Sequence, residues 1–506
     1  MNRGTGHSLV CGLEIHVELA TRTKVLCACP NRFGAEPNTL ACPVCAGLPG
    51  ALPVLNAEAV RLAVLAGLAL DCTIRSRSVM ARKNYFYPDM PKGYQITQYE
   101  EPLCVDGSIL LDDLPGGPRR VRIERAHLEE DAGKLLHDAF GTGTLVDLNR
   151  CGVPLLEIVG APDLRTPEEA RRMMEIVRDR LEACGVSDCR MEEGSLRADV
   201  NVSLLDEATG QFGTRVEIKN VNSFRAVERA VASEARRQER ILGAGGRVVR
   251  ETRLWDDGRG ESRPMRRKET DDDYRYFPEP DLPALRIGPE EVEALRRRLP
   301  EFPAERRRRY RDEMGLLDAD ALLLCRPPAV ARLFESACAA GASPRAAADF
   351  LRVEVFRHLN RAGLDPADVP FGGESLARLL AAVGAGRLAP VGARRVLERM
   401  FEDSGAAADP EGEAERQGLL IRSGGVGLDD LARRVAAAHP AACQDLRAGK
   451  EKAFSFLLGQ AMREARGGAD PKALAEALRR VLSGPGHESA GLTGPAEQAG
   501  GKGDPA

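Results

Sequence analysis

Residues 11–19, C-G-L-E-I-H-V-E-L, alternate apolar and polar side chains without a break. Because successive side chains of an extended strand point to opposite faces, this stretch would bury one face and leave the other polar. The packed face would carry Cys11, Leu13, Ile15, Val17 and Leu19, and the polar face Glu14, His16 and Glu18. The pattern predicts a strand whose polar face combines acids with a histidine, although an ordinary strand with a solvated outer face would look the same.

Two later stretches repeat this design. The first is L-R-A-D-V-N-V-S-L (196–204), with Arg197, Asp199, Asn201 and Ser203 on its polar face, and the second is T-R-V-E-I-K-N-V (214–221), with Arg215, Glu217 and Lys219. Solvated strand faces more often carry Thr, Lys and Gln. Recurring Glu, His, Asp and Asn instead favour a concave site that holds hard cations and phosphate oxygens.

Further carboxylates occur in H-L-E-E-D (127–131) and at Glu157, which stands alone in the apolar run 155–159. A buried acid is costly unless it is paired or ligates a metal. An ion pair with Arg150 is the alternative for Glu157. We expect a magnesium site here, because Mg²⁺ prefers scattered oxygen ligands. The residues predicted to bind the metal and to take part in catalysis are Glu14, His16, Glu129, Glu130 and Glu157. His16 would lie at the edge of this site.

The same hypothesis requires cationic residues that could hold nucleotide phosphates. They are Lys83 and Lys219, with Arg263, Arg266, Arg267, Lys268 and Arg275 in the run 261–275. A solvated loop would explain that run equally well. Neither G-x-x-x-x-G-K-[ST] nor G-x-G-x-x-G is present, so ATP would not bind through a P-loop or a dinucleotide fold.

Four of the thirteen cysteines form a pattern: Cys27-Ala-Cys29 and, after twelve residues, Cys42-Pro-Val-Cys45. Two close thiolate pairs separated by a loop are typical of a tetrahedral Zn²⁺ site. Four thiolates leave no open position, so such a zinc would be structural. Buried free thiols are the alternative.

Composition narrows the class of protein. A chain of 506 residues with 43% hydrophobic content is long enough for two or three domains. Its formal net charge of −4 excludes a generally basic nucleic-acid binder, so RNA contacts would come from local patches.

Residues 1–10 lack a secretory signal, and the longest apolar stretch, 57–70, is shorter than the roughly 20 residues of a membrane span. We expect a cytoplasmic protein with no membrane or DNA partner.

The pattern of apolar and polar residues changes near residue 300. Up to about Glu290, short alternating segments between turns rich in Gly, Pro, Asn and Asp predict a sheet-based domain. From Pro303, helical spacing dominates in 346–359, 376–401 and 428–439, followed by a helix pair at 443–466 and 471–482. We predict an α+β fold, with a domain over 1–295 carrying the cysteine insertion 27–45, helical domains over 296–405 and 406–485, and a disordered tail over 486–506.

Several longer motifs stand in order along the chain. They are G-L-E-I-H-V-E-L from Gly12, R-K-N-Y-F-Y-P-D-M-P-K-G-Y-Q-I-T-Q-Y from Arg82, H-L-E-E-D-A-G-K from His127, V-D-L-N-R-C-G-V-P-L-L-E-I-V from Val146, V-E-I-K-N-V-N-S-F-R from Val216 and D-Y-R-Y-F-P-E-P-D-L-P from Asp273. Together they resemble the GatB/GatE family of tRNA-dependent amidotransferase subunits, and R-A-G-K-E-K-A-F-S-F-L-L-G-Q from Arg447 is similar to the family's tail domain.

The resemblance implies a glutamine-synthetase-like cradle with a mainly antiparallel sheet, followed by a helical domain and a YqeY-like tail domain that contacts the body of the tRNA. It implies an ATP- and magnesium-dependent, glutamine-hydrolysing ligase that acts on Glu-tRNA(Gln) or Asp-tRNA(Asn), with Glu14, His16, Glu129, Glu130 and Glu157 around the metal. The sequence lacks a G-x-C-x-G elbow, so a separate glutaminase (amidase) chain and a small third chain would complete a heterotrimer. The competing interpretation is a zinc-bearing RNA-binding module without catalysis, which predicts aromatic platforms on the strands.

Overall fold

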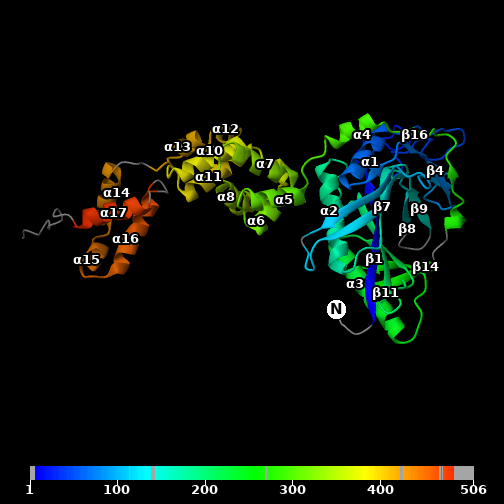
Figure 1. Ribbon diagram of the computed structural model, residues 1–506. Coiled ribbons are helices and arrows are strands. Elements are labelled where there is room, and N and C mark those ends of the chain that lie inside the picture. Colours follow the sequence, from blue (N-terminus) through cyan, green and yellow to red (C-terminus); the bar gives the residue numbers. More distant parts are fainter. Residues whose placement is uncertain are drawn as a thin grey trace, which may run out of the picture. The chain divides into compact units, whose positions relative to one another are not determined.

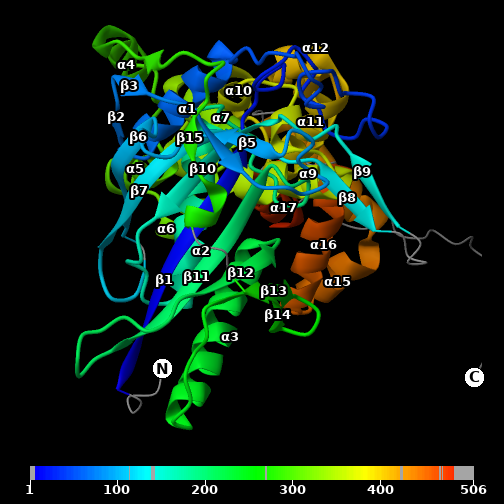
Figure 2. The same cartoon turned by 90° about the vertical axis from the view of Figure 1, so that its right-hand side faces the viewer.

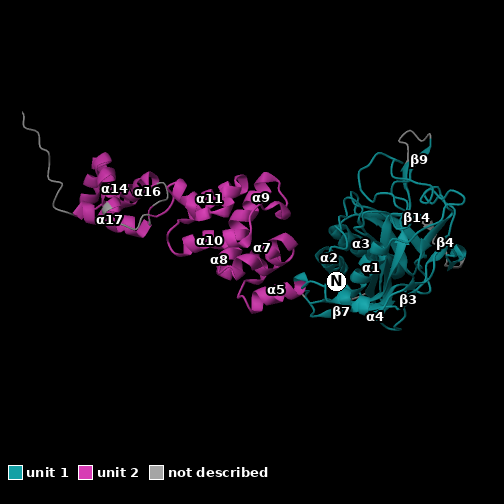
Figure 3. Cartoon of the chain, turned by 90° about the horizontal axis from the view of Figure 1, so that it is seen from above, with its two compact units in different colours: residues 1–303 teal, residues 304–506 magenta. Residues whose placement is uncertain are grey.

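The computed structural model describes residues 6–112, 114–137, 143–267, 271–421, 425–465, 469 and 471–483, without the side chains of residues 137, 266, 267, 271, 272, 425 and 426. The chain divides into two compact units, residues 1–303 and 304–506 (Figure 3). The predicted disordered tail, 486–506, lies outside the described residues. Among those that are described, no helix is long and apolar enough to cross a membrane.

A nine-stranded sheet is the framework of the first unit (Figure 1). In spatial order its strands are β14 (Glu261–Arg267), β13 (Glu251–Asp256), β12 (Val216–Val221), β11 (Leu196–Asp206), β1 (His7–Glu18), β10 (Pro154–Gly160), β7 (Arg119–Glu130), β6 (Cys104–Leu111) and β2 (Thr73–Ile74). Among the described strands of this sheet, only β12 and β13 pair in parallel, and the other neighbours run antiparallel. The predicted α+β fold with a mainly antiparallel sheet is confirmed.

Strand β1 lies in the middle of the sheet and alternates as its sequence predicts. Cys11, Leu13, Ile15 and Val17 are fully buried, and Leu19 just beyond the strand is 1% exposed. On neighbouring β11 the apolar residues at alternate positions from Leu196 to Leu204 are equally buried. The apolar face of the sheet is therefore the core face.

Three helices cover this apolar face: α1 (Ala57–Ala69), α2 (Pro167–Ala183) and α3 (Phe224–Gly243). Each begins at a side chain that accepts a hydrogen bond from the first turn, namely Asn56, Thr166 and Ser223. A fourth helix, α4 (Pro289–Arg296), packs against α1. With one face covered by helices, the polar face is left for a ligand.

Smaller sheets and a short helix complete the first unit. A three-stranded sheet has the order β15 (Phe277–Pro278), β4 (Ala81–Asn84) and β5 (Tyr94–Thr97), and β5 packs against β7. Figure 2 shows these short strands beside the large sheet. Two-stranded sheets join β16 (Leu285–Arg286) to β3 (Arg77–Ser78) and β8 (Lys134–His137) to β9 (Thr144–Asp147), and the 3₁₀ turn η1 spans Asp271–Tyr274.

The described part of the second unit is helical. One core is built from α5 (Pro303–Asp312), α6 (Asp318–Cys325), α7 (Pro328–Ala339), α8 (Pro344–Phe350), η2 (Leu351–Val355), α9 (Phe356–Ala362), α10 (Gly373–Gly384), α11 (Pro390–Glu402), α12 (Ser404–Ala408) and α13 (Pro410–Arg416). The 3₁₀ turn η3 (Pro366–Asp368) contacts α7 but buries no residue. A separate core is built from α14 (Gly425–Ala438), α15 (Pro440–Arg447), α16 (Glu451–Glu464) and α17 (Pro471–Ser483).

A predicted helix and a stretch of predicted helical spacing are each divided in the structure. The stretch 443–466 contains the end of α15 and the whole of α16, because Gly449 between them has φ +84° and turns the chain. The stretch 376–401 spans α10 and α11, which are separated at Gly386, φ +68°. In both places a glycine in the left-handed region ends a helix that periodicity alone would continue. The predicted boundaries at 295 and 405 stay a prediction.

Candidate active site

The polar face of the nine-stranded sheet forms the floor of a cavity of about 500 Å³. Its wall comes from β4, β5 and residues 274–276. Six carboxylates line it: Glu14, Glu124, Glu129, Glu157, Asp199 and Glu217. Five cationic side chains line it as well: Lys83, Arg125, Arg215, Lys219 and Arg250. Charges of both signs in one concave site suit a ligand that combines phosphates with divalent cations.

Strand register assembles the first acidic group, which we define as His16, Glu129 and Glu157. Glu157 on β10 lies opposite His16 on β1 and opposite His127 on β7. His16 Nε2 lies 3.4 Å from Glu157 Oε2 and 3.9 Å from Glu129 Oε1. One ligand atom from each residue of this group lies within 4.8 Å of the others. The three can therefore share one ion.

The first acidic group is strongly coupled electrostatically. Burial disfavours a charged His16, but its hydrogen bond to Glu157 and the nearby carboxylates outweigh burial and raise the pKa of His16 to about 9. Burial and the charge of Glu157 raise the pKa of Glu129 to about 7. Burial also works against ionisation of Glu157, yet His127 and His16 hold the pKa of Glu157 below its usual range. Burial lowers the pKa of His127 to about 4, so this imidazole is neutral at pH 7.

A second acidic group, Glu14, Asp199 and Glu217, lies on neighbouring strands of the same face. Glu14 on β1 is opposite Asp199 on β11, and Asn201 of β11 is opposite Glu217 on β12. One oxygen from each of the three acids lies within 4.8 Å of the others. Asn201 Nδ2 donates a hydrogen bond of 2.9 Å to Glu14 Oε1, and Thr252 Oγ1 donates one of 2.8 Å to Glu217 Oε2.

Both groups fit hard divalent cations. Their ligands are mostly carboxylate oxygens, which Mg²⁺ prefers, with one imidazole in the first group. Beside them, Nδ1 of His127 and Oδ1 of Asn201 are buried without a hydrogen-bond partner among the described residues. Buried polar atoms without partners are uncommon and are explained here if an ion with bound water fills the space. Cation binding would release the proton that His16 holds.

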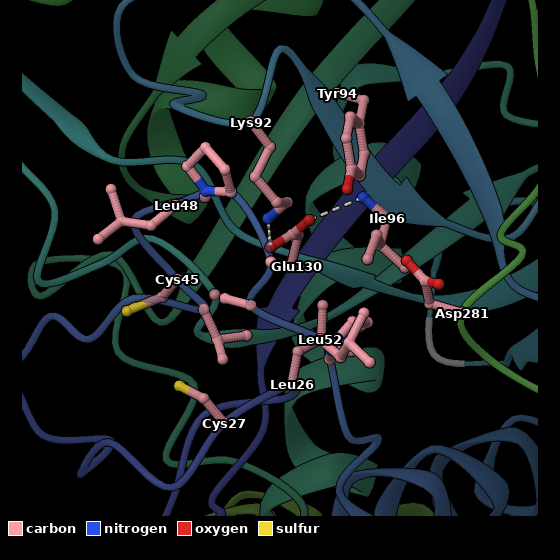
Figure 4. A pocket seen from close by; sticks show the side chains of 17 residues that line it. Leu26, Cys27, Cys45, Leu48, Leu52, Lys92, Tyr94, Ile96, Glu130 and Asp281 are labelled. Atoms are coloured by element: carbon pink, nitrogen blue, oxygen red, sulfur yellow. Dashed lines mark hydrogen bonds and ion pairs between the residues drawn. The ribbon is translucent and has the colours of Figure 1, made fainter.

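Glu130 does not join the acids to which the sequence assigns it. Side chains alternate along β7, so Glu129 faces the cavity while Glu130 points to the opposite face. Figure 4 shows Glu130 facing Lys92 in a second cavity, of about 240 Å³, that Cys27 and Cys45 also line. Glu130 accepts hydrogen bonds of 2.5 Å from Lys92 Nζ and 2.8 Å from the Ile96 backbone N–H. The expectation that Glu130 lies beside the other four residues is corrected.

Glu130→Gln is expected to lower the free energy of unfolding of the first unit by about 3–5 kcal/mol, because it leaves the buried Lys92 ammonium without its partner. Lys92 and Glu130 are 9% and 1% exposed, so solvent would not replace the lost contact. The measurement is denaturant unfolding of the single variants and of Lys92→Met/Glu130→Gln. The double variant should lose much less than the sum of the single losses, and additive losses would contradict the pairing.

The predicted phosphate-binding cations separate in the structure. Lys83 and Lys219 line the cavity. The side chain of Arg266 lies outside the described residues. Arg275 is exposed and has φ +47°, and its carbonyl accepts a hydrogen bond of 2.7 Å from Asn84 Nδ2, but its side chain is not part of the cavity lining that the structure describes. Arg150 pairs with Asp131 at 3.2 Å, so the described contacts do not support an Arg150–Glu157 pair.

Three residues at the two groups were noticed in the sequence without being assigned to the site: His127, Asp199 and Glu217. Each lies on a polar strand face that the alternation identifies. What the sequence does not give is the register that sets His127 against Glu157 and Asp199 against Glu14. Arg215 and Arg250 were missed as cavity residues for the same reason.

Tyrosines stand at the edge of the cavity formed by β4, β5 and residues 274–276. The rings of Tyr99 and Tyr276 are stacked with centroids 4.0 Å apart, and the ring of Tyr274 lies 4.8 Å from the ammonium of Lys83. Exposed faces of such rings suit a nucleobase. The cavity thus offers acids, cations and aromatic rings together.

The four predicted zinc cysteines also come together. One sulfur from each of Cys27, Cys29, Cys42 and Cys45 lies within 4.8 Å of the others. Lys24 is fully buried beside them, and its ammonium donates to the carbonyls of Leu40 at 2.7 Å and Leu148 at 3.3 Å and lies 3.7 Å from Cys45 Sγ. A buried ammonium beside four thiolates would offset the net negative charge of a zinc–thiolate site, so the residues fit zinc.

The loop that follows Cys45 packs closely against Lys92. Gly47 has φ +69°, and a Cβ at this position would lie 2.6 Å from Lys92 Cγ and 3.0 Å from the Lys92 backbone. A glycine is therefore required both by the backbone conformation and by the close contact.

Comparison with known proteins places this architecture in a family. The family model described as the GatB/GatE catalytic domain matches residues 9–293, and the one described as the GatB domain matches residues 332–482. The chain belongs to the GatB/GatE family. Both acidic groups and the four cysteines fall within the span of the GatB/GatE catalytic domain, and α14 to α17 coincide with the end of the GatB domain.

Relatives within the GatB/GatE family cover nearly the whole chain. A protein of Ruminiclostridium cellulolyticum is 47% identical over 472 residues, which is 93% of this chain and 96% of the relative. One of Geobacter sulfurreducens is 46% identical over 481 residues, 94% of this chain and 100% of the relative. Each is named as the B subunit of an aspartyl/glutamyl-tRNA(Asn/Gln) amidotransferase.

Proposed function

We propose that this chain is the carboxylate-activating subunit of a tRNA-dependent amidotransferase. It binds Glu-tRNA(Gln), Asp-tRNA(Asn) or both, and phosphorylates the side-chain carboxylate of the attached amino acid with ATP. Ammonia then displaces phosphate and gives Gln-tRNA(Gln) or Asn-tRNA(Asn). Activation is needed because a carboxylate is a poor acyl donor, and the acyl phosphate supplies a leaving group.

The observation that carries this proposal is the pair of acidic groups in one cavity, flanked by Lys83 and Lys219. Bringing a triphosphate next to a carboxylate means bringing two anions together. Mg²⁺ held by the acidic groups would neutralise phosphate charge and polarise the transferring phosphoryl group. The names of the relatives, which describe amidotransferases acting on tRNA, support the same reaction.

The chain's own residues have separate tasks in this reaction. Lys83 and Lys219 are placed to hold phosphate oxygens at the cavity wall and floor. The stacked rings of Tyr99 and Tyr276 offer a flat surface for a base. Arg215 and Arg250 line the cavity beside the strands of the second acidic group and can contact the acceptor end of the tRNA.

Ammonia has to come from elsewhere. The sequence contains no G-x-C-x-G elbow that would provide a glutaminase nucleophile. The proposal therefore includes a glutaminase (amidase) partner and a small stabilising partner, which form a heterotrimer with this chain. Zinc on the four cysteines is proposed to be structural, since four thiolates leave no position for a substrate.

The test is reconstitution of the chain with its two partners and Glu-tRNA(Gln) or Asp-tRNA(Asn). ATP hydrolysis that depends on the misacylated tRNA, together with amidated product, supports the proposal. ATP hydrolysis that is the same with correctly charged tRNA contradicts it.

Removing α14 to α17 is expected to weaken tRNA binding by about tenfold or more, because contacts to phosphates dominate affinity for nucleic acid. These helices pack around a core of their own that includes Leu431, Leu457 and Leu478. Truncation after Ile421 removes that core whole, whereas a cut at Arg447 would leave α14 without the helices that bury it. Fluorescence anisotropy with labelled tRNA at fixed salt measures the affinity.

Glutaminase activity of the truncated complex serves as the control, because the proposed glutaminase nucleophile belongs to the partner chain and not to this one. An unchanged tRNA affinity would exclude the tail from tRNA recognition.

A further inference from the structure

The second acidic group already contains a positive charge that belongs to the chain. The ammonium of Lys219, on β12, donates to Asp199 Oδ2, and Lys219 Nζ lies 3.6 Å from Glu217 Oε1. Lys219 lies two residues beyond Glu217, so β-strand alternation points both side chains into the cavity. A tethered cation thus stands where a divalent ion would have to bind.

A neighbouring amide shows that this arrangement is incomplete. Asn201 is 7% exposed, and its Nδ2 donates to Glu14, but its Oδ1 is buried without a partner among the described residues. An ammonium has three donors, yet the described contacts direct Lys219 to the carboxylates and not to this amide oxygen. An acceptor left without a donor beside three acids is better satisfied by an ion or its bound water.

The first acidic group contains imidazoles and no lysine. Within the described residues His16 pairs with Glu129 and Glu157, and the neutral ring of His127 lies 3.8 Å from Glu157. Lys83, the other lysine of the cavity, lies over the ring of Tyr274. No lysine therefore competes directly for the carboxylates of the first group in the described contacts.

We propose that Lys219 is a built-in counter-cation that keeps the second acidic group closed to divalent ions until a nucleoside triphosphate draws its ammonium away. This inference rests on the proposed function, because the triphosphate is the ligand that Lys219 would follow. The two groups then fill in order: the first takes a divalent ion from solution, and the second opens only when phosphate oxygens offer Lys219 another anionic partner. Lys219 thus has two roles. It contacts phosphate, and as a positioning residue it determines when the second ion can bind.

This order has a physical reason. With neither nucleotide nor metal bound, three carboxylates close together would repel one another, and burial makes that repulsion costly. Asp199 and Glu217 outweigh the burial of Lys219 and raise its pKa, so the ammonium stays charged in this position. Exchange for a divalent ion without nucleotide would leave the released ammonium with no anionic partner.

The experiment counts bound Mn²⁺, a paramagnetic stand-in for Mg²⁺ with the same preference for oxygen ligands. The full chain is purified with its two partners, without nucleotide, and titrated with Mn²⁺ while free ion is measured by electron paramagnetic resonance. The samples are wild type, Lys219→Met, Lys83→Met and Glu157→Gln. The partners are common to all samples, so ions that they bind cancel in the comparison.

Wild type is expected to bind one Mn²⁺ in the cavity, lost in Glu157→Gln, and Lys219→Met is expected to bind one more. Removing the lysine charge should raise the affinity of the second acidic group for Mn²⁺ by about one to three powers of ten over wild type. A unit charge at this distance shifts a neighbouring binding equilibrium by that range. Lys83→Met should gain no site. Mn²⁺ should also raise the unfolding temperature of Lys219→Met more than that of wild type.

Three results would overturn the inference: wild type that fills both groups without nucleotide, Lys219→Met that gains nothing, or Lys83→Met that gains as much as Lys219→Met. The first of these results is measured on wild type alone. The inference can therefore be refuted even if the Lys219→Met protein does not fold. If wild type and Glu157→Gln bind equal amounts of Mn²⁺, the proposed function loses its cation site, which is a different failure.

Discussion

Glu157→Gln is expected to lower tRNA-dependent ATP hydrolysis and product formation by at least about a hundredfold, or about 2.7 kcal/mol of activation free energy. Glu157 is the member of the first acidic group that contacts both His16 and His127, at 3.4 and 3.8 Å. An amide keeps its shape but removes the negative charge, and with it the strongest ligand for a cation. The measurement is kcat and KM for the reconstituted complex with Glu-tRNA(Gln), and the loss should fall mainly on kcat.

Glu18→Gln is the matched control. Glu18 lies on the same face of β1, two residues beyond His16, but it is not among the residues that line the cavity. Burial and the nearby Asp131 raise the pKa of Glu18 to about 7, so a neutral amide resembles a form that it already adopts. Its activity should stay within about threefold of wild type, a loss of less than about 1 kcal/mol. Equal activity of Glu157→Gln and wild type would remove Glu157 from the site and favour an RNA-binding module without catalysis.

Cys42→Ser is expected to lose most of its bound zinc and to lower the free energy of unfolding of the first unit by at least about 3 kcal/mol. The reason is that the binding energy of a structural zinc, roughly 10–16 kcal/mol in small domains, is also folding energy. The unfolding temperature should fall by roughly 6 °C or more. Turnover at a permissive temperature should fall much less, because no cysteine of the cluster lines the cavity with the acidic groups.

Cys151→Ser separates zinc loss from the cost of altering a buried thiol. Cys151 is fully buried, and its sulfur donates to the Cys45 carbonyl at 3.2 Å, but it does not belong to the four-cysteine cluster. It should keep its zinc, as measured by elemental analysis, with a smaller loss of stability. A Cys42→Ser protein that keeps zinc and fold but loses turnover would refute the structural role.

Much of the sheet was predictable because strand alternation is a local property. The buried set from Cys11 to Leu19 and the polar set Glu14, His16 and Glu18 follow from a period of two residues, and the structure confirms the buried set. The same period also separates Glu129 from Glu130, since neighbouring residues of a strand face opposite ways. The sequence prediction grouped both with His16 because it treated H-L-E-E-D as a cluster and not as a strand.

What could not be predicted depends on contacts between distant segments. Asp199 meets Glu14 and His127 meets Glu157 only because particular strands become neighbours in a particular register. Lys219 was predicted as a phosphate ligand, but its contact with Asp199 needs both the register and the side-chain geometry. The division of 443–466 depends on Gly449 adopting a left-handed backbone, which the amino acid permits but does not require.

The tight fit of Gly47 against Lys92 has a consequence for how this family can change over time. If the four cysteines hold zinc, as proposed, a lineage that held the loop by other means could lose all four together. Gly47 has no such freedom, because any side chain there would strike Lys92, which Glu130 and its own backbone hold in place. Lineages without the cysteines should therefore still keep a glycine at this position.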